Sequence, residues 1–160
     1  MQAVRQGTPH SNQNGSTIVI TGGAQRVGLY CAERLAADGF QVLITCRRLR
    51  DEWQQHPLAP GIVPMLADFS TVPGITQFID DLKERAPALR AIIHNASLWL
   101  DDAAGADALQ QMFMVHMQAP YLINQQCREL FPAGAPADII HLTDDAVSYT
   151  HLTLPTTPYV

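Results

Sequence analysis

Residues 17–28 read Thr-Ile-Val-Ile-Thr-Gly-Gly-Ala-Gln-Arg-Val-Gly, an apolar, β-branched run that breaks into a glycine turn. The run at 17–21 has the composition of a buried parallel strand. Beyond the turn, apolar residues recur at helical spacing, at Leu29, Ala32, Leu35 and Ala36. The stretch therefore predicts a strand, a glycine turn and a helix in direct succession.

This turn has the features of a phosphate-binding loop. Glycines let the backbone approach a pyrophosphate closely, and the free N–H groups and dipole of the following helix favour its negative charge. The spacing is Thr21-Gly22-x-x-x-Arg26-x-Gly28, which meets the three-glycine dinucleotide fingerprint only in part. A structural turn without a ligand stays an alternative at this point.

Short apolar strands alternate with amphipathic helices along the rest of the chain. Further strands are predicted at Val42–Thr45, Ile62–Leu66, Ala91–His94 and Ile139–Leu142. Helices are predicted at Arg26–Asp38, Val72–Arg85 and Asp107–Leu130. Because crossovers of this length join parallel neighbours, the pattern predicts an α/β fold: a Rossmann-like, doubly wound parallel sheet with helices on both faces.

Composition is consistent with one such domain. The chain has 160 residues, 47% of them hydrophobic, and a net charge of −5 without a clustered basic face, which argues against nucleic acid as a partner. No apolar run approaches the roughly 20 residues of a membrane span, and the polar start shows no signal peptide, so we expect a cytoplasmic protein. The three widely spaced cysteines predict neither a disulfide framework nor a metal site; they are Cys31, Cys46 and Cys127.

The end of the second strand bears on the choice of dinucleotide. An NAD site places an acidic residue about 20 residues after the glycine turn, whereas an NADP site places a cation there for the 2′-phosphate. Here Cys46 is followed by Arg47 and Arg48, and Arg26 at the head of the first helix could join them. The pattern favours NADPH, with a solvated basic loop as the alternative.

The ends of the third and fourth strands carry further candidates. Asp68 and Phe69 are placed to contact an adenine, although the same segment could simply cap the following helix. The small residues at 95–97 would let the chain pass close to a ribose or nicotinamide. Trp99 is either a core plug or a stacking plate for a flat heterocycle.

Together these motifs resemble those of the short-chain dehydrogenase/reductase family. The resemblance rests on the Thr-Gly-x-x-x-Arg-x-Gly turn, Asp68, Asn95-Ala96-Ser97 and the Ala-Pro-Tyr at 119–121, and it extends over Thr17 to Ala146. Arginine at the middle-glycine position resembles the pteridine reductase branch. This resemblance implies NADPH-dependent reduction of a dihydropterin by a homo-oligomeric enzyme.

The resemblance also implies residue roles. The pyrophosphate side would be held by Gly22, Arg26, Val27 and Gly28. Arg47 would bind the 2′-phosphate, Asp68 and Phe69 would line the adenine, and Asn95, Ala96 and Ser97 would contact the nicotinamide side. Substrate contacts would come from Ser97, Trp99 and Asp144. Asp144 would be catalytic, because reducing a C=N bond needs a proton on nitrogen as well as a hydride on carbon.

The sequence departs from the family pattern in two places. His116 stands where many relatives have a structural asparagine, which puts the family's water relay in doubt. The expected Tyr-x-x-x-Lys is not found, because Tyr149 comes too early and Thr153 stands at the lysine position. Residues 147–160 resemble translated adapter sequence, so we expect a non-native tail there.

The resulting organisation has three segments. We expect a disordered extension over residues 1–16, the N-terminal part of an NADP-binding Rossmann domain over 17–146, and the tail over 147–160. Such a partial domain would leave the strand at Ile139–Leu142 at an open sheet edge and would be marginally stable and inactive, whereas the intact parent would be the enzyme. The alternatives are a short-chain reductase of a carbonyl substrate and a catalytically dead NADP-binding module.

Overall fold

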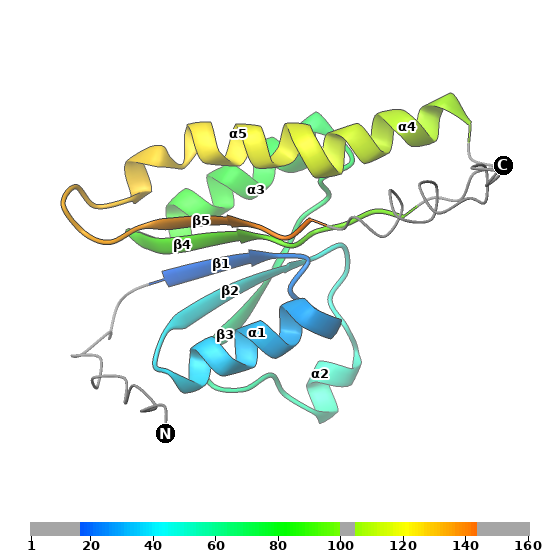
Figure 1. Ribbon diagram of the computed structural model, residues 1–160. Helices are drawn as coiled ribbons and strands as arrows, with labels where there is room; N and C mark the ends of the chain where they lie inside the picture. The colour runs from blue at the N-terminus through cyan, green and yellow to red at the C-terminus, as the bar shows by residue number, and fades with distance from the viewer. Residues whose placement is uncertain (1–16, 100–104, 144–160) are drawn as a thin grey trace, which may run out of the picture.

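The computed structural model describes residues 17–99 and 105–143, which form a five-stranded sheet between two layers of helices (Figure 1). The sheet order is β3-β2-β1-β4-β5 and every pairing is parallel. The strands are β1 (Thr17–Thr21), β2 (Gln41–Cys46), β3 (Ile62–Leu66), β4 (Leu89–His94) and β5 (Asp138–His141). The predicted doubly wound parallel sheet is confirmed, with all five strands within two residues of their predicted bounds.

Helices cover both faces of this sheet (Figure 1). One face carries α1 (Arg26–Ala37) and α2 (Glu52–Gln55). The other carries α3 (Val72–Arg85), α4 (Ala106–Phe113) and α5 (Ala119–Gln126). Among the residues that the structure describes, no helix is long and apolar enough to cross a membrane.

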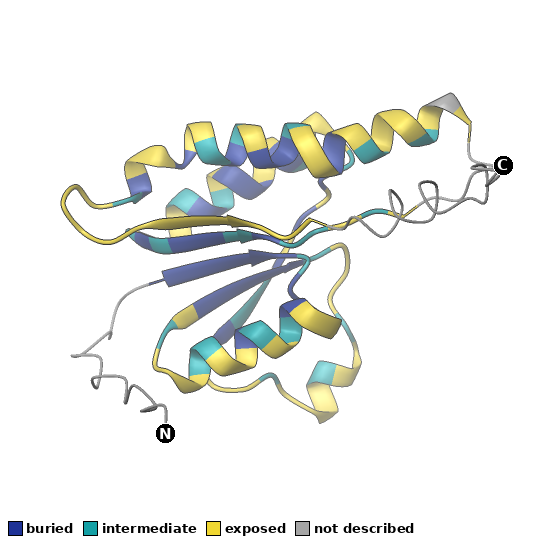
Figure 2. Ribbon diagram, viewed as in Figure 1, coloured by how far each residue is buried: buried dark blue, intermediate teal, exposed yellow. Residues whose placement is uncertain are grey.

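Two separate apolar cores lie on the two faces of the sheet. Strand residues alternate between them, because successive side chains of a strand point to opposite faces. In β1, Ile18 and Ile20 pack with the α1 layer, whereas Val19 packs with the α3 and α5 layer. Figure 2 shows the resulting burial, which is deepest in the central strands. The apolar run at 17–21 is therefore buried on both faces, as expected of a central parallel strand.

Strand β5 forms one edge of the sheet, as the sequence predicts. All four of its residues are exposed, including Ile139 and Ile140 (Figure 2). It pairs in register with β4, and an ion pair between Arg90 and Asp138 joins the two strands at one end. An edge strand with exposed apolar side chains is a site for further strand pairing or aggregation.

The helix predicted at Asp107–Leu130 needs correction. It is interrupted by a π-helical segment at Met114–Gln118, returns to α-helix at Ala119 and ends at Gln126, before a 3-10 turn at Arg128–Leu130. Apolar spacing cannot show such a wider turn, because one extra residue changes the period only locally. The short helix α2 was not predicted, since its four residues are too few for a periodic signal.

Candidate functional site

The carboxyl ends of β1 and β4 lie beside each other in the middle of the sheet. The chain runs from β1 outward to β2 and β3 on one side, and later to β4 and β5 on the other. Such a reversal of strand order opens a crevice at the carboxyl edge, where ligands bind in open α/β sheets. The glycine turn follows β1 and the segment at 95–99 follows β4, so both sequence motifs meet at this edge.

A hydrogen-bond network joins these two segments. The Thr21 hydroxyl accepts from the backbone N–H groups of Asn95 and Ala96, each at 3.0 Å. In return, the Asn95 side-chain amide donates to the carbonyl oxygens of Thr21 and Gly22, both at 3.0 Å. The sequence motifs predict ligand contacts for Asn95 and Ala96 and give no sign of this bonding role for Thr21. The network shows that Asn95 also holds the glycine turn in place.

The glycines are required by close backbone approach. Gly22 has φ +64°, and a Cβ there would lie 2.8 Å from the Cα of Ala96. A Cβ at Gly28 would lie 2.6 Å from the Asn95 side-chain nitrogen and 2.9 Å from the carbonyl oxygen of Gly22. The turn is further tied to β2, because the Gly22 N–H donates to the Thr45 hydroxyl at 2.8 Å. The backbone of the glycine turn therefore packs directly against the segment that follows β4 and against the end of β2.

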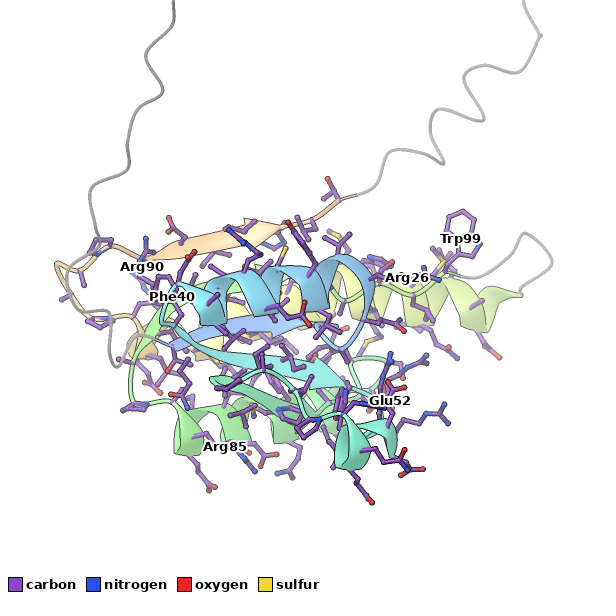
Figure 3. All side chains as sticks on the ribbon, turned by 90° about the horizontal axis from the view of Figure 1, so that it is seen from below. Arg26, Phe40, Glu52, Arg85, Arg90 and Trp99 are labelled. Atoms are coloured by element: carbon purple, nitrogen blue, oxygen red, sulfur yellow. The ribbon has the colours of Figure 1, made fainter. Side chains whose placement is uncertain are left out.

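Four arginines lie in the segments that follow β1 and β2, at the same edge of the sheet as the turn. Arg26 begins α1 and is exposed, with φ +50°, a left-handed conformation that glycine adopts more easily. Arg47 and Arg48 are exposed just beyond β2, and the half-buried Arg50 donates to the Gln25 side chain at 2.9 Å. Figure 3 shows Arg26 at the same end of the sheet as Trp99 and Glu52. This edge can hold the phosphate groups of a nucleotide.

The segment after β3 departs in part from expectation. Asp68 is exposed, and its carboxylate accepts from the N–H and hydroxyl groups of Ser70, at 3.0 and 2.6 Å. These bonds, and secondarily the charge of Arg47, lower the pKa of Asp68. The Phe69 ring is buried edge-on against Phe78 rather than exposed at the sheet edge. The contact between Phe69 and an adenine stays a prediction, which the main chain of this residue could make. The cap of α3 is Thr71, whose hydroxyl accepts from Gly74.

The segment after β4 carries the proposed substrate contacts. Ser97 and Trp99 are exposed, and at 68% exposure Trp99 is not a core plug. His116, from the π-helical segment, places its Nε2 atom 3.2 Å from both the N–H and the carbonyl oxygen of Leu98. A single ring nitrogen can bond either the N–H or the carbonyl oxygen of Leu98, but not both at once. The side-chain amide of an asparagine, which many relatives have in place of His116, offers both a donor and an acceptor. His116 thus contacts Leu98, the residue between the two proposed substrate-binding residues Ser97 and Trp99. Asp144, Tyr149 and Thr153 lie outside the described residues.

His94, at the end of β4, is a buried titratable group beside the site. Its Nε2 lies 2.8 Å from the Asn124 side-chain oxygen, and its ring stacks on His141 of β5 at a centroid distance of 4.6 Å. Burial lowers the pKa of His94 below its ordinary value, an effect that the bond to Asn124 opposes and the neighbouring His141 reinforces. The neutral ring is therefore the form that the fold favours.

Acid should consequently destabilise the fold through His94. Because the folded state binds this proton less readily than the unfolded state, the stabilisation is complete above pH about 6.5 and is lost as the pH falls below it. The melting temperature of His94→Gln should depend less on pH between 7 and 5 than that of the wild type. His56→Gln removes an exposed histidine and should keep the pH dependence of the wild-type melting temperature. If the melting temperatures of His94→Gln and the wild type changed equally with pH, His94 would not be the group responsible for the acid sensitivity.

Comparison with known proteins supports the resemblance seen in the sequence. The family model for short chain dehydrogenases matches residues 16–151. The chain belongs to the short-chain dehydrogenase family. The match spans the glycine turn, all five strands and the segment after β4.

Among curated members of this family, the chain is 36% identical to dihydromonapterin reductase of Citrobacter koseri and 35% identical to that of Escherichia coli O1:K1, over 140 residues in each case. These alignments cover 81% of this chain and 56% of the relatives. The chain thus spans about half the length of the curated relatives it matches. The resemblance to pteridine reductases is confirmed at this level.

Two solved structures share this fold. FolM alternative dihydrofolate reductase 1 from Brucella canis, complexed with NADP, superposes with a TM-score of 0.69 at 26% identity, covering 82% of this chain and 57% of that one. The Pseudomonas aeruginosa RhlG/NADP complex superposes with a TM-score of 0.72 at 21% identity, covering 87% and 58%. The second likeness shows the fold alone.

Proposed function

We propose that this chain binds NADP(H) at the carboxyl edge of β1 and β4. The observation that carries the proposal is the cationic character of this edge. Arg26 lies at the head of α1, and Arg47 and Arg48 follow β2, where an NAD site would have an acidic residue. Cations at these points suit a pyrophosphate and a 2′-phosphate. The NADP bound to the Brucella FolM structure supports the same cofactor.

We further propose that the full-length protein reduces a dihydropterin, with dihydromonapterin as substrate and dihydrofolate as a second one. When bound, NADPH supplies the hydride. The exposed Trp99 gives a flat surface on which a pterin can stack beside the cofactor, and Ser97 lies on the same segment. Asp144 is proposed to move the proton to the pterin nitrogen. The names of the curated relatives support this substrate class.

The proposal is tested with the full-length protein by following NADPH absorbance with dihydromonapterin, dihydrofolate and dihydrobiopterin in parallel. Trp99→Ala should raise the KM for the pterin about tenfold, since stacking on an aromatic ring contributes roughly 1–3 kcal/mol. Asp144→Ala should lower kcat about a hundredfold, the usual contribution of a positioned acid. Trp53→Phe, at the other tryptophan, serves as the control and should leave both constants near those of the wild type.

Other outcomes assign other functions. Reduction of simple ketones without pterin consumption would make the protein a carbonyl reductase. NADPH binding without turnover, together with a full-length sequence that lacks Tyr-x-x-x-Lys, would make it a binding module. The 160-residue chain itself is proposed to bind NADPH weakly without turning over. The cytoplasmic location and the domain boundaries at residues 16 and 146 stay predictions.

The outer surface of α4, the π-helical segment at Met114–Gln118 and α5 supports assembly of the full-length protein into a homo-oligomer. Four large side chains recur there at four-residue spacing, each more than half exposed: Leu109, Phe113, Met117 and Tyr121. Between Asp107 and Arg128 the chain has no charged residue, which is unusual for a solvated helix surface. Two copies can therefore pack this stripe together without bringing like charges into contact.

A charge in the stripe should prevent this assembly. In the symmetric contact Met117→Glu places two carboxylates in an apolar interface, so we expect the dimer Kd to rise at least about a hundredfold. Sedimentation analysis of the full-length protein measures it. Gln54→Glu adds the same charge on α2, on the opposite face, and should assemble like the wild type. Unchanged assembly of Met117→Glu would place the interface elsewhere.

A further inference from the structure

Arg50 differs from the other arginines at this edge because its side chain bridges two segments. One guanidinium nitrogen donates to the side-chain oxygen of Gln25, at 2.9 Å, and the other pairs with Glu52 at 2.8 Å. Glu52 begins α2, and Gln25 directly precedes α1. The side chain of Arg50 therefore connects the glycine turn to the segment between β2 and α2.

This bridge fixes a conformation that the backbone alone disfavours. Arg26 has φ +50°, and a side-chain-bearing residue in the left-handed region costs about 1 kcal/mol or more. Gln25, next to it, is extended and its side chain forms no capping bond with α1. It is instead held by Arg50, so the bond restrains the residue that precedes the strained position.

The same bridge positions the other cationic segment. Arg47 and Arg50 belong to one short connection between the end of β2 at Cys46 and the start of α2 at Glu52. Tying Arg50 to Gln25 therefore fixes the spacing between the segment that carries Arg47 and the turn that carries Arg26. A pyrophosphate and a 2′-phosphate of one dinucleotide lie at a set separation, so their cations must keep a set separation too.

We propose that Arg50 is a positioning residue that sets the preference for a 2′-phosphorylated dinucleotide, by holding the Arg47 segment against the glycine turn through Gln25. The guanidinium acts through Gln25 and Glu52 rather than on the phosphate. This inference rests on the proposed NADP(H) site and adds the element that gives the site its selectivity. NADPH binding needs Arg26 and Arg47 at a fixed separation, because the cofactor carries both a pyrophosphate and a 2′-phosphate. NADH lacks the 2′-phosphate and needs only the glycine turn.

The test compares binding of NADPH and NADH to the 160-residue chain and to four variants, by nicotinamide fluorescence. Arg50→Met and Gln25→Met each remove the bridge and should lower the NADPH-over-NADH preference about tenfold, the effect of losing one hydrogen bond to a charged group. The double variant should lose no more than either single one, because both remove the same bond. Arg85→Met removes an exposed arginine in the last turn of α3, outside the proposed cofactor site, and should change the preference less than threefold, as expected of a screened surface charge.

A second readout needs no cofactor. The N–H of Leu29 donates to the carbonyl oxygen of Gln25, at 3.2 Å, so its hydrogen exchange reports on the turn. Arg50→Met should speed this exchange about tenfold and leave that of Ile79, buried in α3, unchanged. Faster exchange with no nucleotide binding by the wild type would refute the proposed cofactor but not the bridge.

Two results would overturn the inference. Additive losses in the double variant would show that Arg50 and Gln25 act separately. A loss of NADPH affinity in Arg50→Met alone, with Gln25→Met like the wild type and a steep salt dependence, would show that Arg50 binds the phosphate directly.

Discussion

Gly28→Ala should destabilise the fold by about 3 kcal/mol and abolish nucleotide binding, because the added methyl group has no space. Besides the Asn95 side chain, the new Cβ would meet two backbone atoms, at 2.8 Å from the Cα of Gly23 and 2.9 Å from the carbonyl oxygen of Gly22. Backbone atoms cannot move aside as a flexible side chain does. The change must displace either α1 or the glycine turn, and both form the proposed phosphate site.

Thermal unfolding and NADPH titration measure the two effects. Gly105→Ala is the matched control, since a Cβ there meets nothing within 4 Å and the residue has an ordinary negative φ of −74°. It should melt within a few degrees of the wild type, whereas Gly28→Ala should melt roughly 10 °C lower. Equal melting temperatures for the two variants would show that the turn is less tightly packed than the structure indicates.

Asn95→Asp should be nearly as damaging although it conserves size. The Asn95 amide nitrogen donates to the carbonyl oxygens of Thr21 and Gly22. A carboxylate oxygen in its place would face two acceptors, so two attractive contacts would become repulsive. We expect a loss of about 3 kcal/mol in the free energy of unfolding and an NADPH affinity at least about a hundredfold lower.

Urea denaturation gives the first quantity and fluorescence titration the second. Gln110→Glu makes the same amide-to-acid change on the exposed surface of α4 and should alter stability by no more than about 0.5 kcal/mol. If Asn95→Asp behaved like Gln110→Glu, the link between the β4 segment and the glycine turn would have no energetic importance. A stability loss with unchanged NADPH affinity would place the nucleotide away from this turn.

Local sequence patterns were sufficient for most of the fold. The β-branched run at 17–21 has the composition of a buried strand, and alternation with helices of crossover length favours parallel neighbours. Patterns were insufficient where the backbone changes without a periodic signal. The π-helical segment at Met114–Gln118 and the four-residue α2 are of this kind.

The candidate site was predicted less completely than the fold. Residues at strand ends, such as Arg47 and Asn95, were found because the carboxyl edge of a parallel sheet is where ligands bind. The buried position of the Phe69 ring was missed, because a residue that follows a strand can turn either to the edge or to the core. Thr21 belongs to the turn motif, but its hydrogen bonds to Asn95 and Ala96 were missed because nothing in the local sequence brings these residues together.

The sequence by itself determined the doubly wound sheet, the glycine turn and its cationic character, since each depends on residues adjacent in the chain. Only the tertiary structure decided which of these groups act together. Arg50 and Gln25 are 25 residues apart, and Thr21 and Asn95 are 74 apart. Such pairs form because parallel β1, β2 and β4 end at one edge, and no local pattern records a contact between segments so distant in the chain.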